Sequence, residues 1–295
     1  MHQLELIFNL PKLYDQAAIL QFHQRDNQAV AELSLPNGFA KGFMWQAQAM
    51  VVEVRYQTDK VNCLFLSEQA LPAKQALQQW AEHFLGLKQA VAAFVANYQT
   101  HTDLAKLFAK KSALSVAQAA TPFEAVTWAI MGQQVSVHAA VAMRRKLIQQ
   151  LGQQHAYGLY CYPNPQQLAH LSEDQARACG LSSAKYQALQ ALVNEIQQGR
   201  LSLALNDFKA DPSLLMQQLL AIKGIGPWTV NYTLMRGFAY FDGSLHGDLA
   251  VRRNLAKLQG KDNISAKEAE QWLANFQHKA LAAAYLWAME ADEGY

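Results

Sequence analysis

The pattern of apolar and polar residues divides the chain into two regions that differ in their predicted secondary structure. Residues 3–6 alternate polar with apolar, but Ile7 and Phe8 break the alternation, so the first strand is only partly regular. Two later runs alternate better, and the turn-forming residues 58–60 separate them: Val52, Val54 and Tyr56, then Val61, Cys63 and Phe65. We expect these two runs to form a β-hairpin.

The texture changes after this hairpin. Between residues 70 and 97, Ala, Leu and Gln dominate, and Gly86 is the only Gly or Pro after Pro72. Because Ala, Leu and Gln are good helix formers, we expect helix over this stretch. The first part of the chain is therefore predicted to be a small α+β domain at residues 1–100.

Beyond residue 100 the sequence repeatedly shows helix starts. Residues 121–124 (TPFE) combine a capping box with proline at the first helical position, and residues 172–175 and 265–268 form two more boxes. Asn164-Pro165 and Asp211-Pro212 add cap-plus-proline starts. The helices between them carry apolar stripes, such as Ala140, Met143, Leu147 and Leu151. We predict an all-helical domain at residues 101–295, and an α+β chain as a whole.

Composition supports this division. A chain of 295 residues with 51% hydrophobic and 16% charged residues is not disordered, and it exceeds one average domain of about 100–150 residues. The longest apolar run, 280–289, is shorter than the ~20 residues of a membrane span, and no basic-then-apolar leader opens the chain, so we expect a cytoplasmic protein. We interpret Cys63, Cys161 and Cys179 as buried thiols, because their number and spacing fit neither disulfides nor a metal site.

Charge alone leaves the partner open. The net charge of +2 is compatible with nucleic-acid binding but does not require it. Basic residues cluster at 144–146 and 252–253, yet such clusters on helices are more often solvated faces.

The most informative stretch is residues 219–253. A helix that starts at Pro212 cannot continue through residues 223–227 (KGIGP), and Pro227 suits the first turn of a new helix. Gly224 and Gly226 permit a close backbone approach, and the free amides of the new helix can bind an anion such as phosphate. Ile225 between them would anchor the hairpin in the core. A plain turn between packed helices is the alternative.

The wider pattern narrows this choice. Ile222 and Lys223 precede the glycines, Trp228 and Thr229 open the next helix, and Asp248 follows downstream, which resembles the helix-hairpin-helix DNA glycosylase superfamily. Within it the chain is similar to the bacterial 3-methyladenine DNA glycosylase II family, the AlkA type, also over residues 122–140 (PFEAVTWAIMGQQVSVHAA) and 161–171 (CYPNPQQLAHL). The resemblance implies a TATA-binding-protein-like domain followed by helical subdomains around a cleft.

The resemblance assigns the catalytic carboxylate to Asp248. From the residues alone, Asp248 is a helix N-cap, and the two roles are compatible because a capping carboxylate at a cleft edge can also face a cationic sugar. Trp228 stands where strand-cleaving members carry a Schiff-base lysine. Without that amine no imine with the sugar can form, so we expect a monofunctional enzyme that uses water.

By the same resemblance, Trp228, Tyr232 and Trp287 line a base pocket whose electron-rich rings attract a base made cationic by alkylation. From spacing alone, Tyr232 and Trp287 fit a core role better, and Trp228 fits either role. Ala288 stands where a better-known member has another pocket aromatic, which predicts a more open pocket.

The resemblance also predicts DNA contacts. Gln134 occupies the position that wedges into the duplex, where leucine is usual, and its amide could bond to the orphaned base. Exposed glutamines in a plain turn are the alternative. The hairpin contacts fall to Gly224, Ile225, Gly226 and Thr229.

No cofactor is expected. His246 and the other histidines lack metal-binding spacing, and the four grouped cysteines of the iron–sulfur branch are missing. The resemblance leaves one ion open: Na⁺ or K⁺ on the backbone carbonyls of Leu220, Ile222 and Ile225.

The leading hypothesis is a monomeric glycosylase that flips alkylated bases, such as 3-methyladenine, out of double-stranded DNA and excises them by hydrolysis. One rival is a non-catalytic helix-hairpin-helix DNA-binding protein. A second rival is a glycosylase-lyase that acts on oxidised bases.

Overall fold

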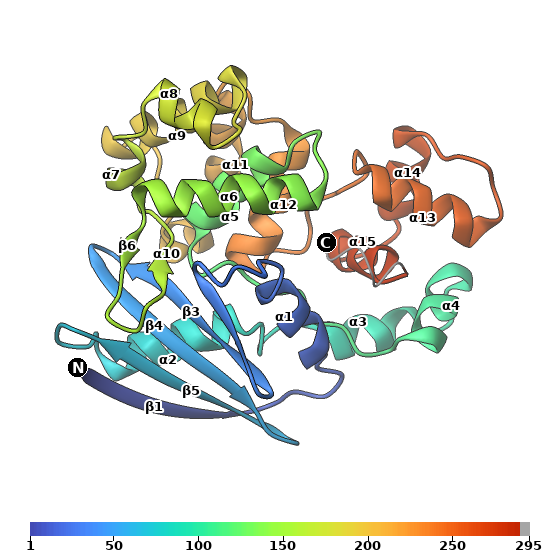
Figure 1. Cartoon of the computed structure of the whole chain (residues 1–295). Coiled ribbons are helices and arrows are strands. Elements are labelled where there is room, and N and C mark those ends of the chain that lie inside the picture. The colour runs from blue at the N-terminus through green and yellow to red at the C-terminus, as the bar shows by residue number, and fades with distance from the viewer. Residues whose placement is uncertain (290–295) are drawn as a thin grey trace.

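The computed structural model describes residues 1–289, in which an antiparallel sheet lies below a larger assembly of helices (Figure 1). The sheet has five strands in the order β1-β5-β4-β3-β2. Its strands are β1 (His2–Asn9), β2 (Glu32–Leu35), β3 (Gly38–Trp45), β4 (Gln48–Tyr56) and β5 (Lys60–Ser67). The expected mixture of sheet and helix is therefore confirmed.

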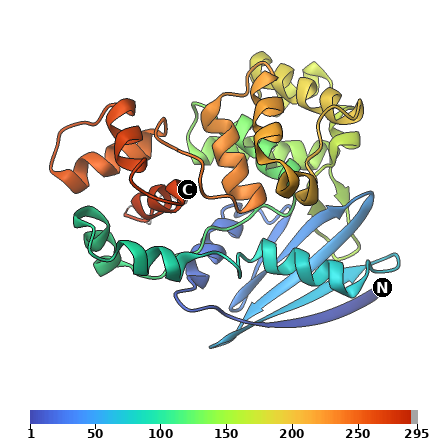
Figure 2. The same ribbon diagram turned by 180° about the vertical axis from the view of Figure 1, so that it is seen from behind.

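The predicted hairpin is the pair β4–β5. Val52 lies opposite Phe65, Val54 opposite Cys63 and Tyr56 opposite Val61, so the alternating apolar residues share one face. Helices α1 (Gln16–His23) and α2 (Lys74–Phe84) supply Ile19, Leu77 and Phe84 to the core on this face. Figure 2 shows α2 lying across the sheet.

The stretch expected to be helical over residues 70–97 is divided into two helices. Helix α2 ends at Phe84, and α3 (Val91–Tyr98) starts seven residues later. Gly86 lies between them with a φ of +68°, a left-handed conformation that ends a helix. The helical prediction for this stretch is therefore confirmed, with a break of six residues around Gly86.

The second region holds the remaining helices and one small ribbon. The helices are α4 (Thr102–Lys110), α5 (Pro122–Gly132), α6 (Val137–Leu151), α7 (Pro165–Leu168), α8 (Glu173–Ala178), α9 (Ser183–Gln197), α10 (Leu205–Ala210), α11 (Pro212–Ala221), α12 (Pro227–Phe238), α13 (Leu249–Gln259), α14 (Ala266–Leu273) and α15 (Lys279–Trp287). Strands β6 (Gln153–Gln154) and β7 (Tyr160–Cys161) pair in an antiparallel ribbon. The ribbon corrects the expectation of an all-helical domain.

Most predicted helix starts are confirmed. Ser172 and Ser265 form reciprocal capping boxes, and Asn164 and Asp211 cap helices that open with proline. Thr121 caps α5 by accepting the N–H of residue 124, but the return bond of the predicted box is not made. The carboxylate at 124 points instead toward the sheet.

That carboxylate belongs to an ion cluster, defined by Glu32, Lys41, Glu124 and Arg144, between the sheet and the helices. Each of these residues is 7% exposed or less. Arg144 Nη2 lies 2.6 Å from Oε1 of both glutamates, and Lys41 Nζ lies 3.0 Å from Glu124 Oε1. The four residues come from β2, β3, α5 and α6, so the cluster ties the sheet to two helices.

The charges of this cluster stabilise one another. Burial alone would raise the pKa of Glu32 and Glu124, but Arg144 and Lys41 outweigh burial and hold both pKa values below their usual range. The expectation of a solvated face at 144–146 is wrong for Arg144. Arg145 is also paired, with Asp26 at 2.7 Å, and Lys146 is exposed.

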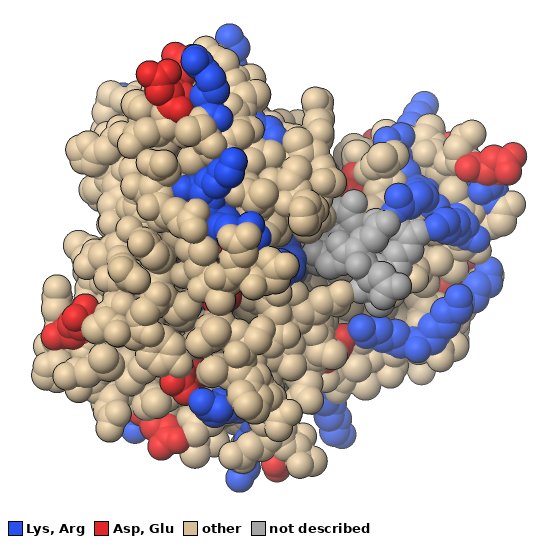
Figure 3. Space-filling model, viewed as in Figure 1, with Lys and Arg blue, Asp and Glu red and all other residues tan. Residues whose placement is uncertain are grey.

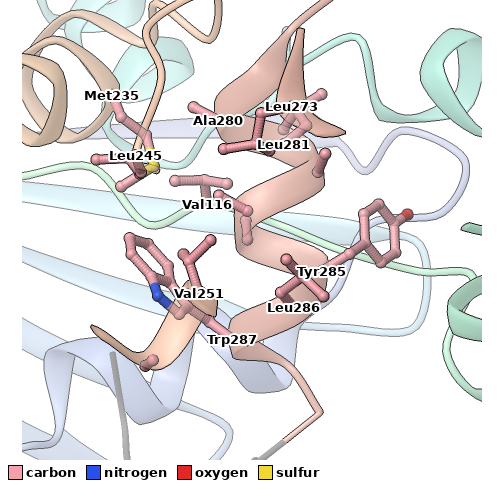
Figure 4. Close-up of a cluster of buried hydrophobic side chains, with 14 of the residues drawn as sticks. Val116, Met235, Leu245, Val251, Leu273, Ala280, Leu281, Tyr285, Leu286 and Trp287 are labelled. Carbon is pink, nitrogen blue, oxygen red and sulfur yellow. The ribbon is translucent and has the colours of Figure 1, made fainter. Parts of the chain in front are cut away.

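The helices form two separate cores. One contains buried residues of α5, α6, α9, α11 and α12, including Ile225 of the hairpin. The other joins α3 and α4 to α13, α14 and α15. In Figure 4, Leu281 and Leu286 of α15 lie in this second core, with Trp287 beside Val251 of α13.

Helix α3 lies inside the predicted domain 1–100 but packs with the C-terminal helices. Tyr98 Oη accepts the N–H of Gln277 at 2.8 Å, and the Phe94 ring stacks on Tyr285 at 6.1 Å. The boundary near residue 100 stays a prediction, and residues 290–295 of the predicted domain 101–295 lie outside the described residues.

Within residues 1–289, no helix is long and apolar enough to cross a membrane. The three cysteines are buried free thiols, as expected. Burial raises the pKa of Cys63, Cys161 and Cys179, so all three are thiols rather than thiolates at neutral pH.

Candidate active site

The predicted hairpin connects α11 to α12. Ile225 is 4% exposed and is held in the core, while Gly224 has a φ of +92°. A side chain at 224 would meet the Ala188 methyl of α9 at 2.9 Å, so only glycine fits there. The space that a side chain at Gly226 would fill is open. The hairpin backbone is thus packed on one side and accessible on the other.

Helix α12 begins at this accessible side. Pro227 is its first residue, and no side chain caps the helix. The first-turn N–H groups of Trp228 and Thr229 therefore have no side-chain acceptor, and the helix dipole adds partial positive charge. This arrangement suits an anion such as a phosphate.

Asp248 caps helix α13 and is 7% exposed. Its Oδ1 accepts the N–H of Val251 at 3.0 Å and the indole N–H of Trp287 at 3.1 Å, and Oδ2 accepts the indole N–H of Trp228 at 2.9 Å. These three neutral donors orient the carboxylate. In the part of the chain that the structure describes, no ion pair involves Asp248.

The predicted pocket aromatics lie together behind this carboxylate. The Trp228 and Tyr232 rings stack with centroids 5.2 Å apart, and Tyr232 lies 6.4 Å from Trp287. Tyr232 and Trp287 are buried, and Trp228 is partly exposed. Because Tyr232 covers one face of Trp228, a flat ligand could stack only on the remaining surfaces of the group.

Sequence reasoning missed several neighbours of these rings. Trp128 of α5 donates its indole N–H to Tyr232 Oη at 2.9 Å. Two guanidinium groups lie against the ring of Phe22 in α1, with Arg25 Cζ 3.7 Å and Arg236 Cζ 4.6 Å from its centroid. Burial lowers the pKa of Arg25 to about 10, so it remains charged at neutral pH. No local spacing pattern marks these residues, because α1, α5 and α12 are distant in sequence.

A groove of about 750 Å³ collects most of the predicted site residues. One wall is the loop of residues 132–136 between α5 and α6, which carries Gln134. The other wall is residues 247–250 with Asp248, and the floor is residues 226–229 of the hairpin and α12. The fold therefore brings Gln134, Gly226, Trp228, Thr229 and Asp248 together around one groove, with Gly224 and Ile225 in the adjoining hairpin.

Gln134 has an unusual backbone. Its φ is +56°, a left-handed conformation that glutamine rarely adopts, and its side chain is exposed. The amide N–H₂ of the preceding Gln133 donates to the Gly224 carbonyl and the Thr229 hydroxyl, each at 2.8 Å. The sequence predicted a wedge role for Gln134, with exposed glutamines in a plain turn as the alternative, and it did not identify this contact of Gln133.

Lys and Arg side chains gather in two places on the face shown in Figure 3, over α4 and α13 and over α6 with its neighbours. Exposed members include Lys106, Lys110, Lys146, Arg253 and Lys257. Basic surfaces of this kind suit a polyanion such as a nucleic-acid backbone.

Among residues 1–289, no group of His, Cys, Asp and Glu could hold a metal ion. Leu220, Ile222 and Ile225, whose carbonyls were expected to hold Na⁺ or K⁺, all lie at the hairpin. The Ile222 carbonyl already accepts the N–H of Ile225 at 3.0 Å, which leaves one lone pair for an ion.

Comparison with known families decides between a helix-hairpin-helix and a plain turn. Residues 127–278, more than half of the chain, match the model of the HhH-GPD superfamily base excision DNA repair protein. The chain belongs to this superfamily. Its helix-hairpin-helix is therefore not a plain turn, and the family predicted from the sequence is confirmed.

Two curated relatives of this superfamily member are similar over much of their length. It is 27% identical over 214 residues to a putative DNA-3-methyladenine glycosylase of Bacillus subtilis, covering 71% of this chain and 70% of the relative. It is 28% identical over 192 residues to DNA-3-methyladenine glycosylase 2 of Escherichia coli, covering 64% and 66%.

Solved structures share the fold over nearly the whole chain. A 3-methyladenine DNA-glycosylase from Archaeoglobus fulgidus matches with a TM-score of 0.81 at 17% identity, covering 97% of this chain and 99% of that one. An 8-oxoguanine glycosylase/lyase from Clostridium acetobutylicum, solved with double-stranded DNA, matches with a TM-score of 0.77 at 16% identity, covering 100% and 99%. At these identities the likeness establishes the fold of this superfamily member, sheet included.

Proposed function

We propose that this protein is a monofunctional DNA glycosylase that flips an alkylated base out of double-stranded DNA and hydrolyses its N-glycosidic bond in base excision repair. The observation that carries the proposal is Asp248, a buried carboxylate that three neutral donors fix at the edge of the groove. The superfamily and the relatives named DNA-3-methyladenine glycosylases support it.

The chemistry follows from this negative charge. As the C1′–N bond breaks, the electron pair leaves with the base and the sugar becomes an oxocarbenium ion. A carboxylate about 4 Å from that cation stabilises it by about 4 kcal/mol at an effective dielectric constant of about 20. That energy corresponds to roughly a 10³-fold rate increase. Water then adds to C1′, its proton passes to Asp248 or to solvent, and an abasic site remains.

The aromatic group would receive the flipped base. Trp228 has an exposed part on the groove, with Tyr232 and Trp287 behind it. An alkylated purine carries positive charge, and the ring faces attract it by cation–π interaction. Such a base is already a good leaving group, so the mechanism needs no general acid. Ala288, with its small side chain, would leave this pocket more open and alter its substrate range.

The hairpin and the loop of residues 132–136 would hold the DNA. The uncapped amides at the start of α12 would bind a backbone phosphate beside the open Gly226. Na⁺ or K⁺ on the carbonyls of Leu220, Ile222 and Ile225 would add positive charge at that phosphate. Gln134 would enter the duplex from the opposite wall and replace the flipped nucleotide.

Three further points belong to the proposal. The N-terminal sheet with α1 and α2 is taken to be a TATA-binding-protein-like domain. The protein acts as a monomer, because one chain supplies the hairpin, the loop of residues 132–136 and Asp248, and its place of action is the cytoplasm. Light scattering of the free protein and of its DNA complex tests the stoichiometry.

The decisive experiment measures base release from methylated double-stranded DNA, with the freed bases identified by chromatography. Wild-type protein is expected to release 3-methyladenine and 7-methylguanine, and Asp248→Asn to release neither while still binding DNA. Asparagine is a matched substitution because it also caps helices well.

The base-release experiment tests the first rival, and a separate trapping experiment tests the second. Tight DNA binding without release of any base would favour a non-catalytic binding protein. A covalent adduct trapped by borohydride on DNA containing oxidised bases would favour a glycosylase-lyase. Because Trp228 offers no amine, we expect no adduct.

A further inference from the structure

The loop of residues 133–136, called here the wedge loop, has little to hold it in place by itself. It connects α5 to α6, and Gln134, Val135 and Ser136 are all exposed. Gln134 also adopts a left-handed backbone conformation that is unfavourable for a residue other than glycine. A strained and exposed loop keeps one conformation only if neighbouring groups hold it.

The side chain of Gln133 supplies such a contact. Its amide nitrogen donates one hydrogen to the Gly224 carbonyl and one to the Thr229 hydroxyl, each at 2.8 Å. Gly224 is in the hairpin, and Thr229 is in the first turn of α12. One side chain thus bonds the wedge loop to both parts of the candidate phosphate site, and both of its donors are satisfied.

Helix α9 also contacts both the end of α5 and the hairpin. Lys185 Nζ donates to the Met131 carbonyl at 2.7 Å, which satisfies a free carbonyl at the end of α5. Gly224 packs against Ala188 of the same helix, with no room for a side chain. The base of the wedge loop and the hairpin are therefore both fixed on α9, and Gln133 joins them at the groove.

We propose that Gln133 is a positioning residue that fixes the wedge Gln134 relative to the phosphate-binding hairpin. The hairpin can then hold the DNA strand while Gln134 fills the gap left by the flipped base, with a fixed distance between the two. This inference rests on the proposed glycosylase function and adds a residue that acts through Gln134 without touching the reacting atoms.

The test compares two substrates that differ in their need for a wedge. In one, 7-methylguanine is paired with cytosine in a duplex, and in the other the same base is an unpaired single-nucleotide bulge. Gln133→Met keeps the length of the side chain and removes both donors. Two lost hydrogen bonds, at about 0.5–1.5 kcal/mol each, predict roughly a tenfold lower single-turnover excision rate on the paired substrate. On the bulge we expect almost no change.

The matched control is Gln198→Met. Gln198 is exposed and, like Gln133, makes an amide hydrogen bond, to Asn194 at 2.7 Å, but at the end of α9 away from the groove. We expect it to excise like wild type on both substrates. Thermal unfolding of both variants checks that the fold is intact.

A double variant separates positioning from local folding. If Gln133 acts only through the wedge, Gln133→Met should cause no further loss once Gln134→Ala has removed the wedge. Equal losses on paired and bulged substrates, additive losses in the double variant, or no loss in an active protein would each overturn the inference alone. Absence of excision by wild type on both substrates would overturn the proposed function and this inference with it.

Discussion

Two buried sets of carboxylates in this protein are held in opposite ways. In the ion cluster, Glu32 and Glu124 face Lys41 and Arg144, and the pairs neutralise each other between the sheet and the helices. At the groove, Asp248 accepts hydrogen bonds from two indoles and one backbone amide, with no cation paired to it among the described residues. Both sets are almost fully buried.

The kind of partner determines whether a buried carboxylate serves stability or reactivity. A buried charge is unfavourable unless other groups stabilise it. An opposite charge stabilises it well, but the neutralised pair then attracts a further ion only weakly. Neutral donors orient a carboxylate and leave its full negative charge for an incoming cation. The ion cluster is thus suited to fixing two layers, and Asp248 to meeting an oxocarbenium ion.

The largest expected effect is on excision by Asp248→Asn. Losing the charge while keeping the helix cap should lower the single-turnover rate about 10³-fold, the equivalent of about 4 kcal/mol. Asparagine keeps the N-cap, but its NH₂ group replaces Oδ2, which accepts the Trp228 N–H, so the free energy of unfolding in urea should fall by about 1–3 kcal/mol. If the variant excises bases at a near wild-type rate, the role of Asp248 in stabilising the oxocarbenium ion is wrong.

Glu124→Gln should have the converse effect. Leaving Lys41 and Arg144 with one carboxylate should lower the free energy of unfolding by about 3 kcal/mol, since broken buried pairs cost about 3–5 kcal/mol. Excision by the folded variant should stay within about twofold of wild type, a difference of less than about 0.5 kcal/mol. Urea unfolding and single-turnover excision measure the two quantities. A variant as stable as wild type would show that the cluster contributes little.

Trp228→Phe probes the neutral donors of Asp248. Phenylalanine keeps an aromatic ring at the groove and removes the N–H that Oδ2 accepts. Hydrogen bonds to charged groups contribute about 1.5–3 kcal/mol, so we expect roughly a tenfold loss of excision rate or more. Trp287→Phe removes the donor to Oδ1 and is the companion variant. Unchanged rates in both would mean that the backbone amide orients the carboxylate alone.

The smallest effect is the pH dependence of the ion cluster. The pKa of Glu124 is lowered in the folded protein, so its stabilisation is present above the unfolded value of about 4.3 and is lost as the pH falls through the folded value. The stability difference between wild type and Glu124→Gln should therefore shrink progressively below pH ~4.3. Urea unfolding at pH 7, 4 and 3 measures it, and a constant difference would contradict the assignment.

Features that depend on residues close together in the sequence were predicted correctly. Caps and prolines located the starts of α5, α8, α11 and α14, alternation located the β4–β5 hairpin, and Gly224 and Ile225 located the turn of the helix-hairpin-helix. Each of these features depends on residues a few positions apart, so the sequence shows it directly.

Features that depend on distant partners were not predictable in this way. Residues 121–124 look like a capping box, but the carboxylate at 124 bonds to Lys41, 83 positions away. Arg144 belongs to a basic run that resembles a surface patch, and its partner Glu32 is 112 positions away. Gln133 likewise contacts Gly224 and Thr229 across the groove. The family resemblance located the site, but the supporting contacts required the fold.

The second helical core has a consequence for synthesis of the chain. Helices α3 and α4 complete it with α13, α14 and α15, as in the bond from Trp272 to Asp103, 169 positions apart. At about 5–20 residues per second, a ribosome needs roughly 10–30 s to extend the chain over that interval. During this time the apolar faces of α3 and α4 lack their C-terminal partners and are more open to chaperones. Trp287, which helps to orient Asp248, emerges later still, so the carboxylate lacks one of its three donors until α15 has been made.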